Sequence, residues 1–213
     1  LVYLEGDALR EAISFVAMQN KEPMWKVEEG LQDPGRVNEI HKQLQGFKDS
    51  GLHIYNHKGA IDIASVYSKI TYMVKGLECE YISLDNLSIS IAGNGADTNE
   101  RREIDQMVFK LISLINNTGC TILNVVHLVK NRKDKEGNDS EVVTRSDVHG
   151  SGAFAKFSHG LIGLERDPDS DCVKLKVLAN RDKGIEGYAD TLTYEASTGR
   201  LNVRVQEPDE DII

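Results

Sequence analysis

A chain of 213 residues is long enough to bury one well-formed core, so we expect a single domain. Its 34 acidic and 25 basic residues give a formal net charge of -9, which excludes a protein coated in nucleic acid through its overall charge and leaves only a local basic patch for such binding. Three cysteines at wide, unpatterned spacings exclude a disulfide framework or a zinc site, and no apolar run approaches the roughly 20 residues of a membrane span.

Apolar runs alternate with helical patterns along the first two thirds of the chain. Short apolar runs predict strands at 1–4, 52–55, 81–84 and 121–127, the last of them buried. Apolar positions at helical spacing predict helices over 7–19, 37–47, 61–75 and 100–116. The first strand is already under way at Leu1, without a Met or a preceding turn, so we expect a domain that has been cut into.

The last third starts with a charged segment without periodicity, which predicts a loop over 130–142. The elements expected after it are a Gly-started helix over 150–157, strands at 160–165 and 173–180, and a hairpin of 192–194 with 201–205. An acidic tail, 207–213, follows a domain that spans 1–206. Because strands and helices alternate, the sequence predicts an α/β fold with a mostly parallel sheet flanked by helices on both faces.

The segment Tyr81–Leu87 is the most informative one, because its apolar run ends on a carboxylate, Asp85, beside the polar Asn86. A phosphate-bound Mg²⁺ keeps several waters, so one carboxylate at the carboxyl end of a buried parallel strand can hold the ion through a water. The same residues also fit a strand that simply ends in a turn. The segment alone leaves both interpretations open.

Two further polar side chains follow strands that we expect in the same sheet. Glu5 comes directly after strand 1–4, and carboxyl ends of parallel strands share the edge where open α/β folds bind ligands. Glu5 could therefore orient an attacking water, or it could be an exposed residue near a helix start. His127 could hydrogen-bond a terminal phosphate, or it could be a structural histidine.

A basic run stands out in this acidic chain. Its four cations within six residues are Lys130, Arg132, Lys133 and Lys135. Such a loop can neutralise the phosphates of a nucleic-acid strand, although a charge run is more often a solvated loop.

Two other features allow a phosphate contact. The glycines of Gly150-Ser151-Gly152 let a phosphate or a neighbouring subunit approach the backbone closely, or they form a plain turn. Arg181, just after strand 173–180, could reach a transition-state phosphate in its own or the next subunit, or it could belong to a surface hairpin.

In their order and spacing these segments resemble the RecA-like helicase domain of the DnaB-type family. The nearest likeness is to the helicase half of the helicase-primases of short-tailed phages and to the related mitochondrial helicase Twinkle. The resemblance runs from Leu1 to Gly199, and its strongest blocks are Ile82–Ile89, Val126–Leu128, Gly150–Ala153, Gly163–Arg166 and Arg181–Tyr194. It implies a replicative DNA helicase that moves 5′ to 3′ on single-stranded DNA as a hexameric or heptameric ring and hydrolyses ATP or dTTP with Mg²⁺.

The resemblance also implies roles for the residues around the phosphates. Glu5 matches the catalytic glutamate that activates water, and Asp85 matches the Walker B aspartate that holds Mg²⁺ through water. His127 matches the phosphate sensor that links the nucleotide state to DNA contacts. Arg181 matches the arginine finger that a subunit gives to its neighbour's site.

Other matched positions concern the base, the DNA and the partners. Arg166 and Tyr194 match the pair that sandwiches the nucleotide base, a role that their flat π-faces suit. Segments 92–99 and 130–139 match loops that face single-stranded DNA in the ring's channel, which implies DNA contacts for Asn94, Lys130, Arg132, Lys133, Lys135, Gly150, Ser151 and Gly152. The family further implies a primase domain and a DNA polymerase as partners, in the cytoplasm of a phage-infected or bacterial cell, without a signal peptide or membrane segment.

The chain departs from the family at the phosphate loop. A Gly-rich loop ending in Gly-Lys-Ser/Thr should precede Leu1 by one helix, and no such motif occurs in the chain. Without its amides and lysine the β- and γ-phosphates lose their main cradle, so we expect the chain alone to be inactive. Three further departures affect the coupling of nucleotide to DNA: Lys156 replaces a usual Gln, Ala179 a frequent Lys, and His149 a frequent basic residue.

Two functions from different classes remain open. The first is a nucleotide-driven helicase domain seen without its first strand and phosphate loop. The second is a catalytically inactive RecA-like module that binds DNA or a replication partner. A recombinase with the same core is disfavoured by the block from Gly150 to Arg166.

Overall fold

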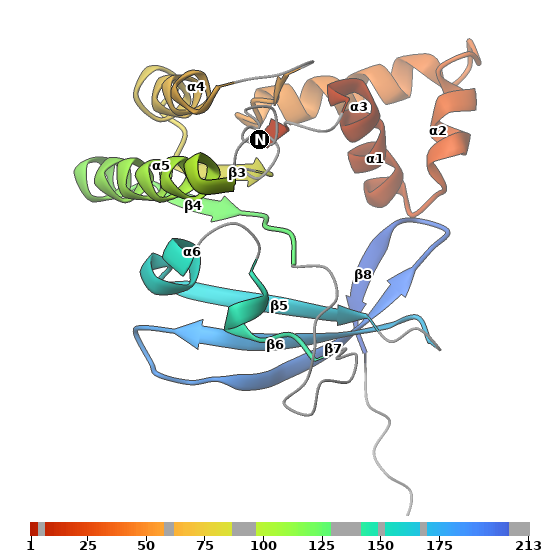
Figure 1. Cartoon of the computed structure of the whole chain (residues 1–213). Coiled ribbons are helices and arrows are strands. Elements are labelled where there is room, and N and C mark those ends of the chain that lie inside the picture. Colours follow the sequence, from red (N-terminus) through yellow and green to blue (C-terminus); the bar gives the residue numbers. More distant parts are fainter. Residues whose placement is uncertain are drawn as a thin grey trace, which may run out of the picture.

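The computed structural model describes residues 1–3, 7–57, 62–86, 97–128, 142–148, 152–166 and 170–204, and over 97–101 it describes the backbone only. Within these ranges, eight strands form two four-stranded sheets (Figure 1). The first is parallel, as the alternation of strands and helices predicts, and the second is antiparallel. The α/β fold is therefore confirmed, with an antiparallel sheet added to the parallel one.

The first sheet has the strand order β2-β1-β3-β4. Its strands are β1 (Val2–Tyr3), β2 (Tyr55–Asn56), β3 (Tyr81–Asp85) and β4 (Thr121–Asn124). Tyr3 lies opposite Asp85, and Leu84 lies opposite Asn124. The carboxyl ends of β1, β3 and β4 therefore meet at one edge of the sheet.

Two long helices cover one face of this sheet. They are α4 (Ile63–Gly76), which Asp62 caps by accepting a hydrogen bond from the Ser65 N–H, and α5 (Asp97–Thr118). The alternating β3 side chains Ile82 and Leu84 are buried against them, since successive residues of a strand point to opposite faces. None of the helices in the described ranges is long and apolar enough to cross a membrane.

A separate helical cluster follows β1. It comprises α1 (Ala8–Asn20), α2 (Met24–Gly30) and α3 (Val37–Asp49). Its small core is formed by Ile13, Val16, Ala17, Val27 and Ile40. The sequence predicts α1 and α3 closely, whereas the polar composition around α2 leaves that helix without a clear periodic signal.

The second sheet has the order β5-β6-β7-β8. Its strands are β5 (Gly160–Arg166), β6 (Cys172–Asn180), β7 (Gly187–Glu195) and β8 (Arg200–Val203). A short 3-10 turn, η2 (Arg145–Asp147), and helix α6 (Gly152–Phe157) precede it. The predicted terminal hairpin is present, but its first strand begins earlier than expected, at Gly187.

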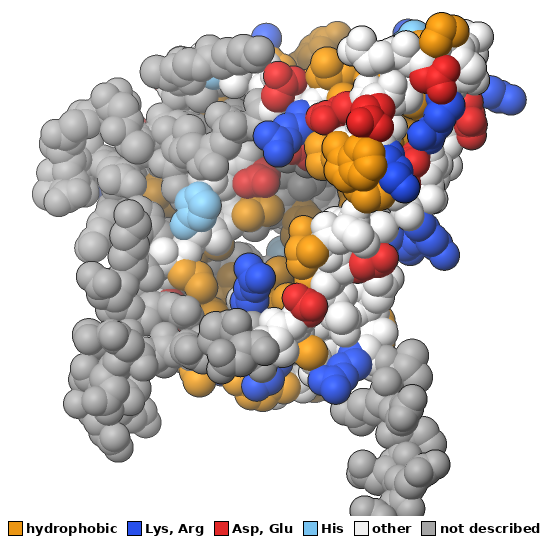
Figure 2. Space-filling model, turned by 90° about the vertical axis from the view of Figure 1, so that its right-hand side faces the viewer, with side chains coloured by type: hydrophobic (Ala, Val, Ile, Leu, Met, Phe, Trp, Pro, Cys, Tyr) orange, Lys and Arg blue, Asp and Glu red, His pale blue; other side chains and the backbone are white. Residues whose placement is uncertain are grey.

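The prediction of a buried strand over 121–127 is wrong in extent and in burial. β4 ends at Asn124, and Leu123 and Val125 are 64% and 40% exposed. The physical reason is that Leu123 and Val125 point to the face of the first sheet opposite the buried Ile82 and Leu84, and the described part of the chain leaves that face open. β4 and β5 are also the outermost described strands of their sheets. β5 exposes apolar side chains too, with Ile162 at 60% and Leu164 at 53%. Figure 2 views the molecule from the side toward which β4 and β5 run. It shows an opening with hydrophobic side chains at its rim.

Candidate functional site

Asp85 and His127 come from neighbouring strand ends and are linked through Asn86. Asp85 ends β3 with a half-buried side chain, and Asn86 is fully buried. Asn86 Nδ2 lies 2.9 Å from His127 Nε2, so the amide donates to that ring nitrogen when the nitrogen carries no proton. His127 is exposed. The pair thus holds the exposed His127 beside the Asp85 strand end.

Asn124 ends β4 beside the Asp85 strand end, but its side chain shares a face with the buried Leu84 and therefore points away from the face of Asp85. It sits opposite Leu84, one residue before Asp85. Its Oδ1 and Nδ2 are buried, and in the described part of the chain they make no hydrogen bond. Leaving a buried polar group unsatisfied costs about 1–3 kcal/mol, so the position favours a polar partner. The signal in the sequence is one amide within the apolar run 122–126.

Arg166 and Tyr194 lie on one face at one end of the second sheet. Arg166 pairs with Val173, and Val173 pairs with Leu192. Tyr194 follows two residues later and therefore points to the same face. Both side chains are exposed, Tyr194 at 38%. Because β3, β4 and β5 run toward the same side of the molecule (Figure 1), this pair lies on the same side as Asp85.

Arg181 lies at the opposite end of the second sheet. From Val173 to Arg181 the chain rises about 26 Å, at about 3.3 Å per residue. The Arg181 Nε donates to the Ser158 carbonyl at 2.9 Å, and its backbone N–H donates to the His159 carbonyl at 2.9 Å. The side chain is exposed. One chain therefore does not bring Arg181 to the face shared by Arg166 and Tyr194.

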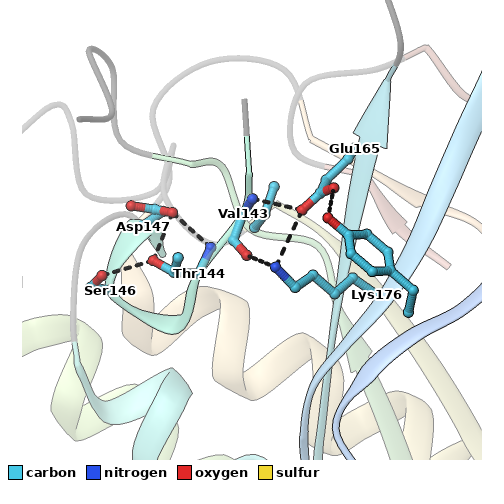
Figure 3. Close-up of polar contacts among 7 residues, drawn as sticks. Val143, Thr144, Ser146, Asp147, Glu165 and Lys176 are labelled. Atoms are coloured by element: carbon cyan, nitrogen blue, oxygen red, sulfur yellow. Dashed lines mark hydrogen bonds and ion pairs between the residues drawn. The ribbon is translucent and has the colours of Figure 1, made fainter. Parts of the chain in front are cut away.

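On the other face of the second sheet, two charged side chains hold Val143 (Figure 3). The Val143 N–H donates to Glu165 Oε1 at 2.7 Å, and Lys176 Nζ donates to the Val143 carbonyl at 3.1 Å. Lys176 Nζ also lies 3.6 Å from Glu165 Oε1, and the Tyr188 hydroxyl donates to Glu165 Oε2 at 2.8 Å. The Glu165 and Lys176 side chains are only 9% and 18% exposed. Segment 142–148 is thereby fixed to β5 and β6.

The hydrogen bond from Tyr188 to Glu165 alters the titration of the phenol. Donation to Glu165, with burial and the charge of the same carboxylate, raises the pKa of Tyr188 above its ordinary value of 10.0. A raised pKa stabilises the fold below the ordinary value, and this contribution is lost as the pH rises through the raised pKa. We expect Glu165→Gln to return the Tyr188 pKa toward 10.0. Phenolate absorbance, with Tyr188→Phe to identify the signal, measures it; an unmoved midpoint would contradict the contact.

Several predicted site residues lie outside the described ones. They are Glu5, Asn94, Lys130, Arg132, Lys133, Lys135, Gly150 and Ser151, and the tail 207–213 lies outside them too. Gly152 is described as the first residue of α6, and a Cβ added there would meet nothing within 4 Å. Packing within the described chain therefore does not require glycine at this position.

The parallel sheet with polar strand ends has the arrangement of a RecA-like fold, which solved helicase domains share. A solved ATPase domain has a TM-score of 0.68 at 17% identity, covering 95% of this chain and 74% of that one. A DnaB-like replicative helicase, solved in a study of its interactions with primase, has a TM-score of 0.71 at 16% identity, covering 95% and 50%. These likenesses show the fold.

Sequence comparison gives a further likeness. The DNA helicase/primase of Enterobacteria phage T3 is 30% identical over 179 residues, which are 83% of this chain and 31% of that protein. No family model matches the chain. The chain thus has the RecA-like fold of DnaB-like helicase domains and is similar in sequence to a phage DNA helicase/primase. It spans less than a third of the length of its phage relative.

Proposed function

We propose that the chain is the nucleotide-hydrolysing domain of a replicative DNA helicase that moves along single-stranded DNA as a ring. The observation that carries the proposal is the position of Asp85 and His127 at adjacent strand ends, joined through Asn86. Arg166 and Tyr194 face the same side of the molecule. Strand ends of this kind are where open α/β folds bind nucleotides.

Each residue has a role in the proposed hydrolysis. The Asp85 carboxylate is the hard oxygen ligand that Mg²⁺ prefers, and it would hold the ion through a water. When bound, the ion neutralises charge on the phosphates of ATP or dTTP. Glu5 would accept the proton of the attacking water, and His127, oriented by Asn86, would contact the terminal phosphate.

The nucleotide base and the DNA would bind at the remaining positions. Arg166 and Tyr194 would stack on the base from one face of the second sheet. The cations of 130–135 and the backbone at Gly152 would contact the DNA phosphates. Open space around Gly152 supports this assignment, because a backbone contact needs room for the phosphate.

The phosphates also need a cradle, and no Gly-Lys-Ser/Thr motif occurs in the 213 residues. We expect the phosphate cradle to lie in the opening between β4 and β5 (Figure 2). Both are edge strands that expose apolar side chains, Leu123, Ile162 and Leu164 among them. A strand inside a parallel sheet is covered on both faces and is therefore apolar. An additional apolar strand that leads into a phosphate loop would fit between β4 and β5.

Arg181 would complete the site of a neighbouring subunit. Arg181 lies about 26 Å along the strand from Val173, the residue that pairs with Arg166, at a rise of about 3.3 Å per residue. Its own chain therefore does not bring it to the base-binding pair. This separation supports a ring of six or seven copies, in which a primase domain and a DNA polymerase would be further partners.

The salt dependence of single-stranded DNA binding tests the proposal. Replacing Lys130, Lys133 and Lys135 with Ala should weaken DNA binding. The slope of log K against log salt concentration should become about 2 less steep, because each lost phosphate contact removes about 0.7 from the slope. The control replaces the exposed Lys42, Lys48 and Lys75 and should keep the slope. An equal slope in both triple variants would count against the DNA contact. The second candidate, an inactive RecA-like module that binds a replication partner, would then be favoured.

A further inference from the structure

The turn that joins β6 to β7 carries Arg181, and we call its residues 181–186 the Arg181 turn. It lies at the end of the second sheet near α6 (Figure 1). The Arg181 Nε donates to the Ser158 carbonyl, and the Arg181 N–H donates to the His159 carbonyl, each at 2.9 Å. The chain directly after α6 therefore holds the first residue of the turn.

Arg145, in the 3-10 turn η2, holds the other end of the Arg181 turn. Its Nη2 forms an ion pair with Glu186, the last residue of the turn. Its Nε donates to the carbonyl of Leu178, which precedes Arg181 by three residues. One guanidinium therefore joins the strand that leads into the turn to the residue that ends it.

A bulge in β6 makes the Leu178 carbonyl available to Arg145. The pairing of β6 with β5 passes from Ala179 to Val177, and the pairing of β6 with β7 ends at Val177. Leu178 is thus the extra residue of the bulge, and it is buried. An extra residue of this kind has no partner in the ladder, and a buried carbonyl needs a donor. Arg145 supplies that donor just before the chain reaches Arg181.

Apolar packing does not hold the Arg181 turn. Every residue of the turn is exposed, and its apolar Ile185 is 63% exposed. The ion pair of Arg145 with Glu186 is itself half-exposed, and such a pair adds little to stability because water weakens the attraction between its charges. A planar guanidinium with two partners instead fixes their relative direction. Orientation, more than stability, is what Arg145 supplies to the turn.

We propose that Arg145 is a positioning residue for Arg181. By binding the Leu178 carbonyl and Glu186 at the same time, it fixes the angle at which the turn presents the Arg181 guanidinium to a neighbouring subunit. The inference rests on the proposed function, in which Arg181 completes the neighbour's site. Orientation matters there, because displacing a catalytic group by about 1 Å can slow a reaction about 10²-fold.

Four variants separate the contacts of Arg145 from the rest of the fold. Arg145→Ala removes both contacts of the guanidinium, and Glu186→Ala removes one of them. Glu186→Gln is the conservative variant, because its amide oxygen still accepts from Arg145. Lys183→Ala is the matched control, since it changes an exposed side chain of the same turn and keeps the backbone N–H that donates to Asn180.

The first readout is hydrogen exchange in the chain of 213 residues. It follows the Gly184 amide, which donates to the Asn180 carbonyl at 2.8 Å, and the NMR signal of the Arg181 Nε–H. Arg145→Ala and Glu186→Ala should speed exchange of the amide and weaken the Nε–H signal. Glu186→Gln and Lys183→Ala should match the wild type. Wild-type exchange in both alanine variants of the ion pair would overturn the positioning role.

The second readout is nucleotide turnover by the chain extended at Leu1 with a strand, a Gly-Lys-Ser/Thr loop and a helix. Arg145→Ala should lower kcat about 10- to 10²-fold and leave KM unchanged, because a misplaced Arg181 loses a contact made in the transition state. Glu186→Ala should lower kcat in the same direction. Glu186→Gln and Lys183→Ala should keep the wild-type kcat.

Mixed rings distinguish positioning from damage to the fold. When Arg145→Ala and Asp85→Asn subunits are mixed, some interfaces combine the intact Asp85 of one variant with the intact Arg181 turn of the other. Those interfaces should regain turnover. A general loss of folded protein in Arg145→Ala would give no such recovery and would overturn the positioning role.

The remaining outcomes separate the inference from the function on which it rests. Wild-type kcat in Arg145→Ala and Glu186→Ala, with a lowered kcat in Arg181→Ala, would overturn the inference and leave the proposed function intact. Absence of turnover in the extended wild type, or wild-type turnover in Arg181→Ala, would overturn the proposed role of Arg181 and the inference together. If Arg145→Ala does not fold, the comparison of Glu186→Ala with Lys183→Ala decides alone.

Discussion

Glu5→Gln is expected to lower nucleotide turnover about 10²–10⁴-fold, the range of a lost general base, while nucleotide binding persists. The register of β1 on β3 supports this, because Tyr3 lies opposite Asp85 and Glu5 follows Tyr3 by two residues in the sequence. An amide keeps the shape of the carboxylate but does not accept a proton from water. The measurement is steady-state hydrolysis by the chain extended at Leu1 with a strand, a Gly-Lys-Ser/Thr loop and a helix.

Two comparisons make this result specific. Glu28→Gln changes an exposed glutamate of α2 and should leave turnover unchanged. Asp85→Asn should reduce Mg²⁺-dependent nucleotide binding as well as turnover, since the carboxylate is the proposed ligand of the ion. Turnover in Glu5→Gln equal to that of the extended wild type would remove Glu5 from the catalytic role.

Arg181→Ala is expected to lower turnover about 10³-fold in the same extended chain, the lower end of what an arginine finger contributes. Because we propose that Arg181 completes the site of a neighbour, mixing variant subunits into wild-type rings should reduce activity by more than their fraction. A loss strictly proportional to that fraction would count against a shared site. Lys183→Ala, in the same exposed turn, is the control and should be nearly silent.

A complementation experiment addresses the shared site directly. Rings assembled from a mixture of Arg181→Ala and Asp85→Asn subunits contain some interfaces with an intact Asp85 on one side and an intact Arg181 on the other. Those interfaces should hydrolyse nucleotide although each variant alone does not. If Arg181 instead serves its own subunit, every site in the mixture lacks one group and activity stays absent.

The strand-end part of the candidate site was predictable from sequence because it depends on short-range spacing. The run that becomes β3 alternates and then ends on Asp85, and burial of Ile82 and Leu84 follows from that alternation. The helices α1, α3, α4 and α5 were predicted for the same reason, since apolar residues at helical spacing mark a buried face.

Burial of β4 was not predictable from the same kind of pattern. Its apolar residues resemble those of a strand covered on both faces, but Leu123 is 64% exposed because it points to the face of the sheet that the described part of the chain leaves open. Which face is covered depends on how the helices pack on the sheet. A local window of sequence does not contain that information.

The sequence by itself determined the periodic elements and the polar residues that end them, because both follow from contacts between residues close in the chain. Only the tertiary structure decided that Asn86 holds His127 across 41 positions and that Arg166 and Tyr194 share a face while Arg181 lies at the far end. It also decided that Glu165 and Lys176 form hydrogen bonds with the backbone of Val143. These contacts depend on register, and the shifts after Leu161 and Leu175 change which side chains share a face.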